Sequence, residues 1–138
     1  MQRKILLVDD EESVRLSLGF WLRRNSFQVT LCGAVDDARA ALERERFDCV
    51  ISDFRLTPRG EEGLTLLQAA RDADPLVRCI LVTASASDEI PATLRDGSNC
   101  TLYHKPVDVF ELLRLLGAPL GEVLPSHAWG RTPAPATV

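Results

Sequence analysis

The sequence predicts an α/β protein in which helices cover both faces of an open, doubly wound parallel sheet. Five apolar runs of strand length alternate with segments of helical periodicity, as in repeated strand–helix–strand units. The first three runs are apolar almost throughout, which is typical of strands buried on both faces. With 138 residues, of which 46% are hydrophobic, the chain is large enough to form one domain around a substantial core.

The five predicted strands are short and rich in β-branched or other apolar residues. They are KILLV at 4–8, FQVTLC at 27–32, DCVIS at 48–52, RCILVT at 78–83 and TLYH at 101–104.

Helices are expected between these strands, where apolar residues recur every three or four positions. The pattern predicts helices over 13–25, over 35–46, around 64–67 with an end before Pro75, and over 109–117. The fourth helix, between the last two strands, is restricted to a start near Pro91, because a helix interior does not tolerate proline.

Composition excludes several classes of partner. The net charge of −4 and the pI near 5.2 argue against nucleic-acid binding by this chain, because phosphate binding needs a basic patch and the basic residues are scattered. No signal peptide or apolar membrane span is evident, so we expect a cytoplasmic protein with no membrane contact. The four cysteines form no C-x-x-C pair, and we expect reduced thiols that bind no metal.

The last part of the chain differs from the rest. Residues 118–138 are rich in proline and lack helical or strand periodicity, which is typical of a linker. We therefore expect one domain at 1–117 and a poorly ordered tail or linker at 118–138.

Carboxylates follow two of the predicted strands. Asp9 and Asp10 come after the first strand, and Asp53 comes after the third. Ligands of open α/β sheets bind beyond the carboxyl ends of the strands, so a fold that makes these strands neighbours gathers three carboxylates at one edge. Such hard oxygen ligands suit Mg²⁺ or Mn²⁺. Taken alone, an Asp-Asp pair after an apolar strand is more often a helix N-cap signal than a metal site, and Asp10 could simply start the first helix.

The fourth predicted strand ends with the hydroxyl of Thr83, and a cation, Lys105, stands at the end of the fifth. A carboxylate nucleophile, a metal, a hydroxyl and an ammonium group together suit a phosphoryl group, whose transfer depends on positioning and charge stabilisation. Singly, each residue has a simpler explanation: Asp53 as a turn residue, Thr83 as a strand-end hydroxyl, and Lys105 as a solvated charge. Their joint order at the strand ends indicates the phosphoryl site.

Four motifs, ILLVDDEESVR, VISDFRL, ILVTA and HKP, occur in an order and at spacings that resemble the receiver domain of two-component response regulators. The resemblance covers about residues 3–117. It implies a flavodoxin-like sheet with strand order 2-1-3-4-5. It also implies a signalling phosphoacceptor that promotes only its own Mg²⁺-dependent phosphorylation and dephosphorylation, and no enzyme in the ordinary sense.

The resemblance implies a role for each residue of the metal site. Asp53 would accept a phosphoryl group from a histidine kinase or a histidine phosphotransfer protein. Asp10 would bind Mg²⁺ directly and Asp9 largely through water. Asp53 and the backbone carbonyl of Arg55 would complete the protein ligands.

It also implies how the phosphoryl group is held and sensed. Thr83 would donate a hydrogen bond to one phosphoryl oxygen, and Lys105 would pair with another. Pro106 would follow a cis peptide bond that aims Lys105 inward. The partner surface would be the one near the fourth helix, the fifth strand and the fifth helix, used by a downstream output domain or protein and, in many receivers, for homodimers.

Two features depart from the family pattern. The switch aromatic normally stands three residues before the lysine, where this chain has Leu102, and Tyr103 would face the other way along the strand. The position of Gly97 raises the alternative of a bulge that returns Tyr103 to the inner face. The loop after the phosphoacceptor is also long, reaching Gly63 and placing arginines 55 and 59 over the site.

These departures leave a second hypothesis, a receiver-fold module that binds its partner constitutively because phosphorylation switching has decayed. A metal-dependent phosphatase with an aspartate nucleophile is a more distant alternative. Such an enzyme normally has a second aspartate two residues after the nucleophile, and here that residue is Arg55.

Overall fold

The computed structural model describes residues 2–95 and 100–117. Their five parallel strands form one sheet in the order β2-β1-β3-β4-β5, which confirms the predicted fold class and strand order. The strands are β1 (Lys4–Val8), β2 (Gln28–Cys32), β3 (Cys49–Asp53), β4 (Arg78–Thr83) and β5 (Cys100–His104). The helices are α1 (Glu12–Arg24), α2 (Val35–Arg44), α3 (Glu62–Ala73), α4 (Ala92–Arg95) and α5 (Val109–Leu115).

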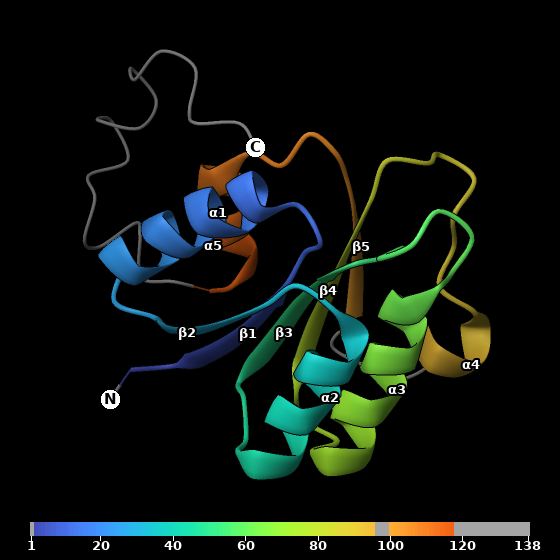
Figure 1. Cartoon of the computed structure of the whole chain (residues 1–138), viewed down its shortest axis with the longest axis horizontal. Helices are drawn as coiled ribbons and strands as arrows, with labels where there is room; N and C mark the ends of the chain where they lie inside the picture. The colour runs from blue at the N-terminus through green and yellow to red at the C-terminus, as the bar shows by residue number, and fades with distance from the viewer. Residues whose placement is uncertain (1, 96–99, 118–138) are drawn as a thin grey trace.

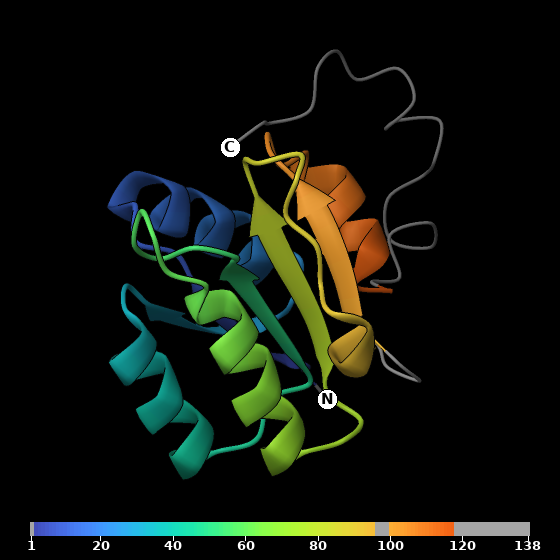
Figure 2. The ribbon, with the colours of Figure 1, turned by 90° about the vertical axis from the view of Figure 1, so that its right-hand side faces the viewer.

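The sheet lies between two helical layers. Helices α1 and α5 cover one face, and α2 and α3 cover the other, with α4 beside them (Figures 1 and 2). Side chains alternate along each strand, so every central strand contributes to both hydrophobic cores. The core under α2 and α3 includes Leu6, Val8, Val50 and Leu81, and the core under α1 and α5 includes Ile5, Leu7, Ile51 and Ile80.

The helix ends refine the sequence-based boundaries. Helix α1 begins at Glu12 with Glu11 as its N-cap residue, so Asp10 does not cap it. Helix α4 is a single turn that begins directly after Pro91, as the restriction on proline predicts. Asp108 caps α5, because its carboxylate accepts hydrogen bonds from the backbone N–H groups of Phe110 and Glu111.

Gly63 allows α3 to begin against the end of β3. Its N–H donates to the carbonyl of Phe54 at 3.0 Å. A Cβ atom at this position would collide with the carbonyl oxygen of Asp53 and lie 2.8 Å from the Cα of Phe54. Because these obstacles are backbone atoms, only glycine fits this approach.

The four cysteines lie inside the described fold, three of them buried and Cys100 half-buried. Cys32, Cys49, Cys79 and Cys100 are free thiols, and burial raises the pKa of Cys79 to about 12. None of the helices in the described ranges is both long and apolar enough to span a membrane. The predicted tail at 118–138 and Gly97 lie outside the described residues.

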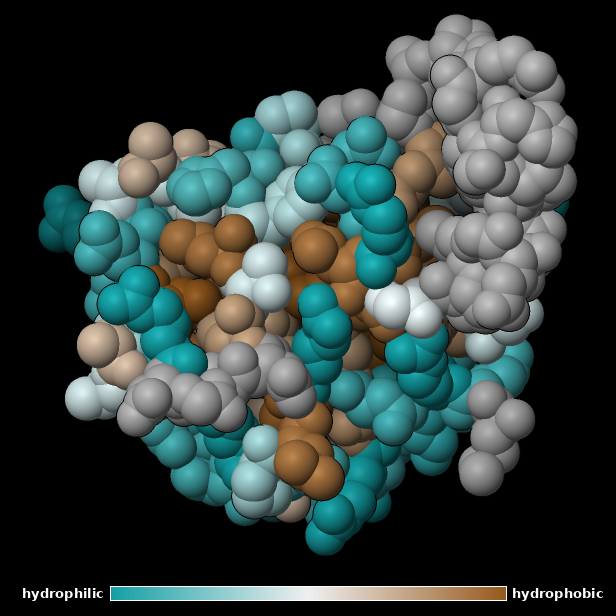
Figure 3. All heavy atoms as spheres, turned by 180° about the vertical axis from the view of Figure 1, so that it is seen from behind, coloured by the Kyte–Doolittle hydropathy of each residue, from teal (hydrophilic) through white to brown (hydrophobic). Residues whose placement is uncertain are grey.

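Strand β5 forms one edge of the sheet, and a groove lies beside it. A groove of about 500 Å³ beside β5 and α5 is lined by Leu102, Tyr103, Leu115 and their neighbours. Figure 3 shows hydrophobic side chains gathered between polar ones on the face turned away from the viewer in Figure 1.

Candidate functional site

Three carboxylates, which we call the carboxylate rim, meet at the carboxyl ends of β1 and β3. One oxygen each from Asp9, Asp10 and Asp53 lies within 4.8 Å of the other two. Asp9 and Asp53 are buried, whereas Asp10 is exposed. The strands that carry them are paired in parallel, which brings residues far apart in sequence to one edge. Several hard oxygen donors with one side open to water fit Mg²⁺, which keeps several of its waters when bound.

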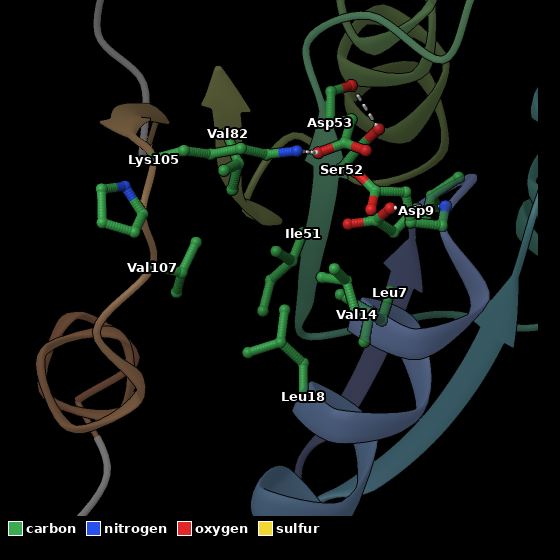
Figure 4. Close-up of a pocket in the computed structure, with 13 residues that line it drawn as sticks. Leu7, Asp9, Val14, Leu18, Ile51, Ser52, Asp53, Val82, Lys105 and Val107 are labelled. Atoms are coloured by element: carbon green, nitrogen blue, oxygen red, sulfur yellow. Dashed lines mark hydrogen bonds and ion pairs between the residues drawn. The ribbon is translucent and has the colours of Figure 1, made fainter. Parts of the chain in front are cut away.

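Lys105 reaches this rim from the end of β5. Its ammonium nitrogen lies 3.2 Å from Oδ1 of Asp53, and Figure 4 shows the side chain extending across the sheet edge to that carboxylate. The backbone N–H of Lys105 donates to the carbonyl of Thr83 at 2.8 Å, which anchors the lysine to β4. The Lys105–Pro106 peptide bond is cis, as the family resemblance implies.

Burial and two neighbouring charges determine the pKa of Asp53. Burial and the neighbouring Asp9 raise the pKa of Asp53 to about 7, against the opposing effect of Lys105. Burial lowers the pKa of Lys105, but attraction to Asp53 and Asp9 outweighs it, so this pKa is raised overall. One ammonium group therefore does not balance the rim, and a divalent cation would relieve the remaining repulsion.

Asp9 is held firmly within the rim. Its Oδ1 accepts a hydrogen bond from the N–H of Glu11 at 2.8 Å, and its backbone carbonyl accepts one from Nη1 of Arg15 at 2.8 Å. The first bond orients the Asp9 carboxylate from the start of α1, and the second fixes the backbone that carries it.

An apolar cleft of about 430 Å³ opens beside these polar groups. Figure 4 shows Asp9, Asp53 and Lys105 along one side, with Val14 and Leu18 of α1 and Val107 below them. Apolar walls limit access of water and so strengthen the electrostatic interactions of the groups at the mouth.

Thr83 lies at the end of β4, and its hydroxyl is already engaged. Oγ1 donates to Oδ2 of Asp88 at 2.6 Å and accepts a hydrogen bond from the N–H of Ser85 at 3.0 Å. Asp88 is a functional candidate that the sequence reasoning missed. It is one polar residue in the loop SASDE, and nothing in its spacing indicates that it is buried.

Arg55 pairs with this same carboxylate. Its Nη2 lies 2.6 Å from Oδ1 of Asp88 and 3.8 Å from a carboxylate oxygen of Glu61. The guanidinium group also donates to the carbonyl of Gly60 at 3.1 Å. Of the two arginines expected over the site, Arg55 lines the small cleft that contains Asp53, and Arg59 is an exposed residue of the same loop.

Leu102 and Tyr103 point to opposite faces of β5. The pairing with β4 runs without interruption from Cys100 to His104, so no bulge returns Tyr103 to the other face. Leu102 packs on the core under α2 and α3, which by alternation is also the face of Thr83. Tyr103 packs on the core under α1 and α5, and its hydroxyl oxygen accepts from the N–H of Asp108 at 3.2 Å.

Comparison with known proteins supports the resemblance along most of the chain. Residues 5–116 match the model of the response regulator receiver domain family. Response regulator protein PilR of Pseudomonas aeruginosa is 32% identical over 119 residues, which are 86% of this chain and 26% of that protein. The chain therefore spans about a quarter of the length of this relative.

Two solved receiver domains have similar folds. The CheY-like receiver domain protein of Methanospirillum hungatei is 28% identical, with a TM-score of 0.74 over 88% of this chain and 96% of that one. The receiver domain of sensor histidine kinase PA1611 from Pseudomonas aeruginosa is 29% identical, with a TM-score of 0.69 over 88% of this chain and 100% of that one. That structure has a magnesium ion coordinated in its active-site cleft.

Proposed function

This chain belongs to the family of response regulator receiver domains, and from that premise we propose that Asp53 is its phosphoacceptor. The phosphoryl donor would be a phosphohistidine on a histidine kinase or a histidine phosphotransfer protein. The observation that carries the proposal is the meeting of Asp53 with two further carboxylates and with Lys105 at one sheet edge.

The proposed transfer is a nucleophilic displacement at phosphorus. A carboxylate oxygen of Asp53 attacks the phosphorus, a P–O bond forms, and the P–N bond to the donor imidazole breaks with its electron pair returning to the imidazole nitrogen. Lys105 stabilises negative charge on the phosphoryl oxygens, and the hydroxyl of Thr83 donates to another oxygen once it is released.

The rim residues would also make the proposed phosphoryl transfer depend on a divalent metal ion. Asp9, Asp10, Asp53 and the backbone carbonyl of Arg55 would hold Mg²⁺, and Mn²⁺ has the same ligand preference. When bound, the ion neutralises charge on the carboxylates and on the oxygens of the phosphoryl group. The PA1611 receiver domain, with magnesium in its cleft, supports this choice of cation.

Phosphorylation would act on the partner surface through the end of β4. A phosphoryl group adds a charge of about −1.5 to −2 and three strong acceptor oxygens, which draw Thr83 and the following loop toward Asp53. The readout would be an altered surface near α4, β5 and α5 for a downstream output domain or protein. Because Leu102 occupies the switch position, we propose that displacement of the loop, and not rotation of a ring, carries the signal.

The test is the intact mass of the protein after incubation with Mg²⁺ and acetyl phosphate. We expect one phosphoryl adduct in the parent chain, none in a chelated sample, and none in Asp53→Asn. An adduct that persists in Asp53→Asn would place the phosphoacceptor at another residue and contradict the proposal.

One observation favours a second candidate, a constitutive interaction module. The hydroxyl of Thr83 is engaged by Asp88, and Tyr103 is held on the other face of β5, so the resting site has no free switch residue among those described. Such a module would bind its partner equally well with and without the phosphoryl group. Partner affinity that changes on phosphorylation would exclude it.

A further inference from the structure

We propose that Asp88 is a positioning residue that holds the Thr83 hydroxyl in the resting protein and must release it before Thr83 can bind a phosphoryl oxygen. Arg55 holds Asp88 in place from the neighbouring loop. The inference rests on the proposed function, because it describes how the site responds to a phosphoryl group on Asp53. We call these three residues the Arg55–Asp88–Thr83 bridge.

The hydroxyl of Thr83 has one proton and therefore one acceptor at a time. In this structure that acceptor is Oδ2 of Asp88, at 2.6 Å. The side chain of Asp88 is 4% exposed, so water does not compete for this bond. A phosphoryl oxygen can recruit Thr83 only by displacing Asp88.

Asp88 is anchored as well as buried. Its other oxygen, Oδ1, accepts from Nη2 of Arg55 at 2.6 Å. Hydrogen bonds from Arg55 and Thr83 lower the pKa of Asp88, so the carboxylate is ionised at neutral pH and is a strong acceptor. The two loops that flank Asp53, 54–61 after β3 and 84–91 after β4, are thus tied together through one carboxylate.

The bridge lies where the phosphoryl group would be. A small cleft of about 150 Å³ is lined by Asp53, by Lys105 and by all three bridge residues. A phosphoryl group in this cleft competes with Asp88 for the Thr83 proton and for the guanidinium of Arg55. Loss of the bridge would therefore move both loops together.

The test is the Mg²⁺-dependent affinity of the full chain for fluoroberyllate, a stable mimic of a phosphoryl group. In Asp88→Asn the competing acceptor is neutral and weaker, so we expect binding to tighten about tenfold, the effect of one charge-assisted hydrogen bond. Glu61→Gln is the matched control. It removes the other carboxylate beside Arg55 without touching Thr83, and we expect less than about a twofold change, as for an exposed pair.

Introducing Asp88→Asn into a Thr83→Val variant distinguishes competition for the Thr83 proton from a purely electrostatic effect of the Asp88 carboxylate. Thr83→Val removes the hydroxyl and keeps the shape of the side chain, so Asp88→Asn introduced there should change the affinity by less than about twofold. An equal gain in both backgrounds would mean that Asp88 acts through charge alone, and it would overturn the proposal.

A measurement on the parent chain keeps the proposal testable even if Asp88→Asn does not fold. The Ser85 N–H donates to Oγ1 of Thr83, so its amide chemical shift, with that of Asp88, should change when fluoroberyllate binds. Saturated binding with both amide shifts unchanged would overturn the inference.

The same experiments distinguish a wrong assignment of the phosphoacceptor site from a wrong role for Asp88. If the parent chain forms no Mg²⁺-dependent adduct and binds no fluoroberyllate, the proposed function is wrong and the inference falls with it. If the parent binds and Asp88→Asn gives no gain, the inference alone is wrong.

Discussion

The carboxylate rim and the Arg55–Asp88–Thr83 bridge lie on two sides of Asp53, and they hold charge in opposite ways. The rim places three carboxylates within 4.8 Å of one another with one ammonium group beside them, so it has unbalanced negative charge. In the bridge, the carboxylate of Asp88 is satisfied on one side by a guanidinium and on the other by a hydroxyl.

Because of this difference, the rim favours ligand binding, whereas the bridge opposes it. The rim is destabilised until a cation or a proton arrives, so ligand binding is favoured there. The bridge is stable as it stands, so a ligand that needs Thr83 must first break it. A receiver with both features would bind metal readily and would rearrange its loops only when a phosphoryl group supplies enough interaction energy.

The largest expected effect comes from removing one carboxylate of the rim. Asp10→Ala leaves the buried carboxylates without their exposed partner, and we expect Mg²⁺ affinity to fall by at least about 100-fold, the upper range for support of a metal site. Titration of Mg²⁺ followed by amide chemical shifts measures this loss.

Glu12→Gln is the control for the rim, because Glu12 is an acidic residue in the first turn of α1 that takes no part in the cluster. Its Mg²⁺ affinity should stay within about twofold of the parent, as expected for an exposed charge. Equal losses in Asp10→Ala and Glu12→Gln would mean that the rim acts only through its net charge.

The pH dependence of stability is the next effect in size. The pKa of Asp53 is raised in the folded, metal-free protein from 3.8 to about 7, so the folded state binds a proton that the unfolded state has lost between these values. Stability should therefore fall as pH rises from about 4 to about 7, by on the order of 3 kcal/mol.

Denaturant unfolding in a chelator at several pH values measures this term. Asp53→Asn should remove it, so the variant should be more stable than the parent at pH 8 and similar to it near pH 4. Saturating Mg²⁺ should restore the stability of the parent chain at high pH. An unchanged pH dependence in Asp53→Asn would show that another group causes it.

The bridge contributes to this profile with the opposite sign. The pKa of Asp88 is lowered by its hydrogen bonds from Arg55 and Thr83, so its contribution to stability is present above its unfolded pKa and is lost as pH falls through its folded pKa. The stability that the bridge contributes is therefore lost at acidic pH, below about pH 4. In Asp88→Asn, stability should depend less on pH below about pH 4. The fall in stability between about pH 4 and pH 7 should remain, because it comes from Asp53.

The smallest effect concerns the backbone that supports both regions. Gly63→Ala should destabilise the protein by about 2 kcal/mol, because the added methyl group meets the backbone of β3 and of the loop that carries Arg55. Gly19→Ala in α1 is the control, since its nearest neighbours are side-chain atoms of Leu31, which can move. It should be neutral or stabilising by about 0.5 kcal/mol, through helix propensity. Similar losses in both variants would refute the steric explanation.

Some of the site could be predicted because it lies at the ends of strands. Each of the five predicted residues lies at or just after the end of an apolar run of strand length, and parallel strands bring their carboxyl ends to one edge. These residues are Asp9, Asp10, Asp53, Thr83 and Lys105. Helix boundaries were predicted less well. The segment 35–46 was expected to be helical throughout, but α2 ends at Arg44, because tertiary contacts decide where the last turn stops.

The sequence alone predicts the order of the elements, the two-faced burial of the central strands and the placement of carboxylates at strand ends, because these depend on local periodicity and on strand direction. The partner of Thr83 and the pairing of Arg55 with Asp88 come from the tertiary structure alone, which also shows that no bulge returns Tyr103 to the face of Leu102. These features depend on how loops fold back and on strand register. Both are set by contacts between residues distant in the sequence, which no local pattern encodes.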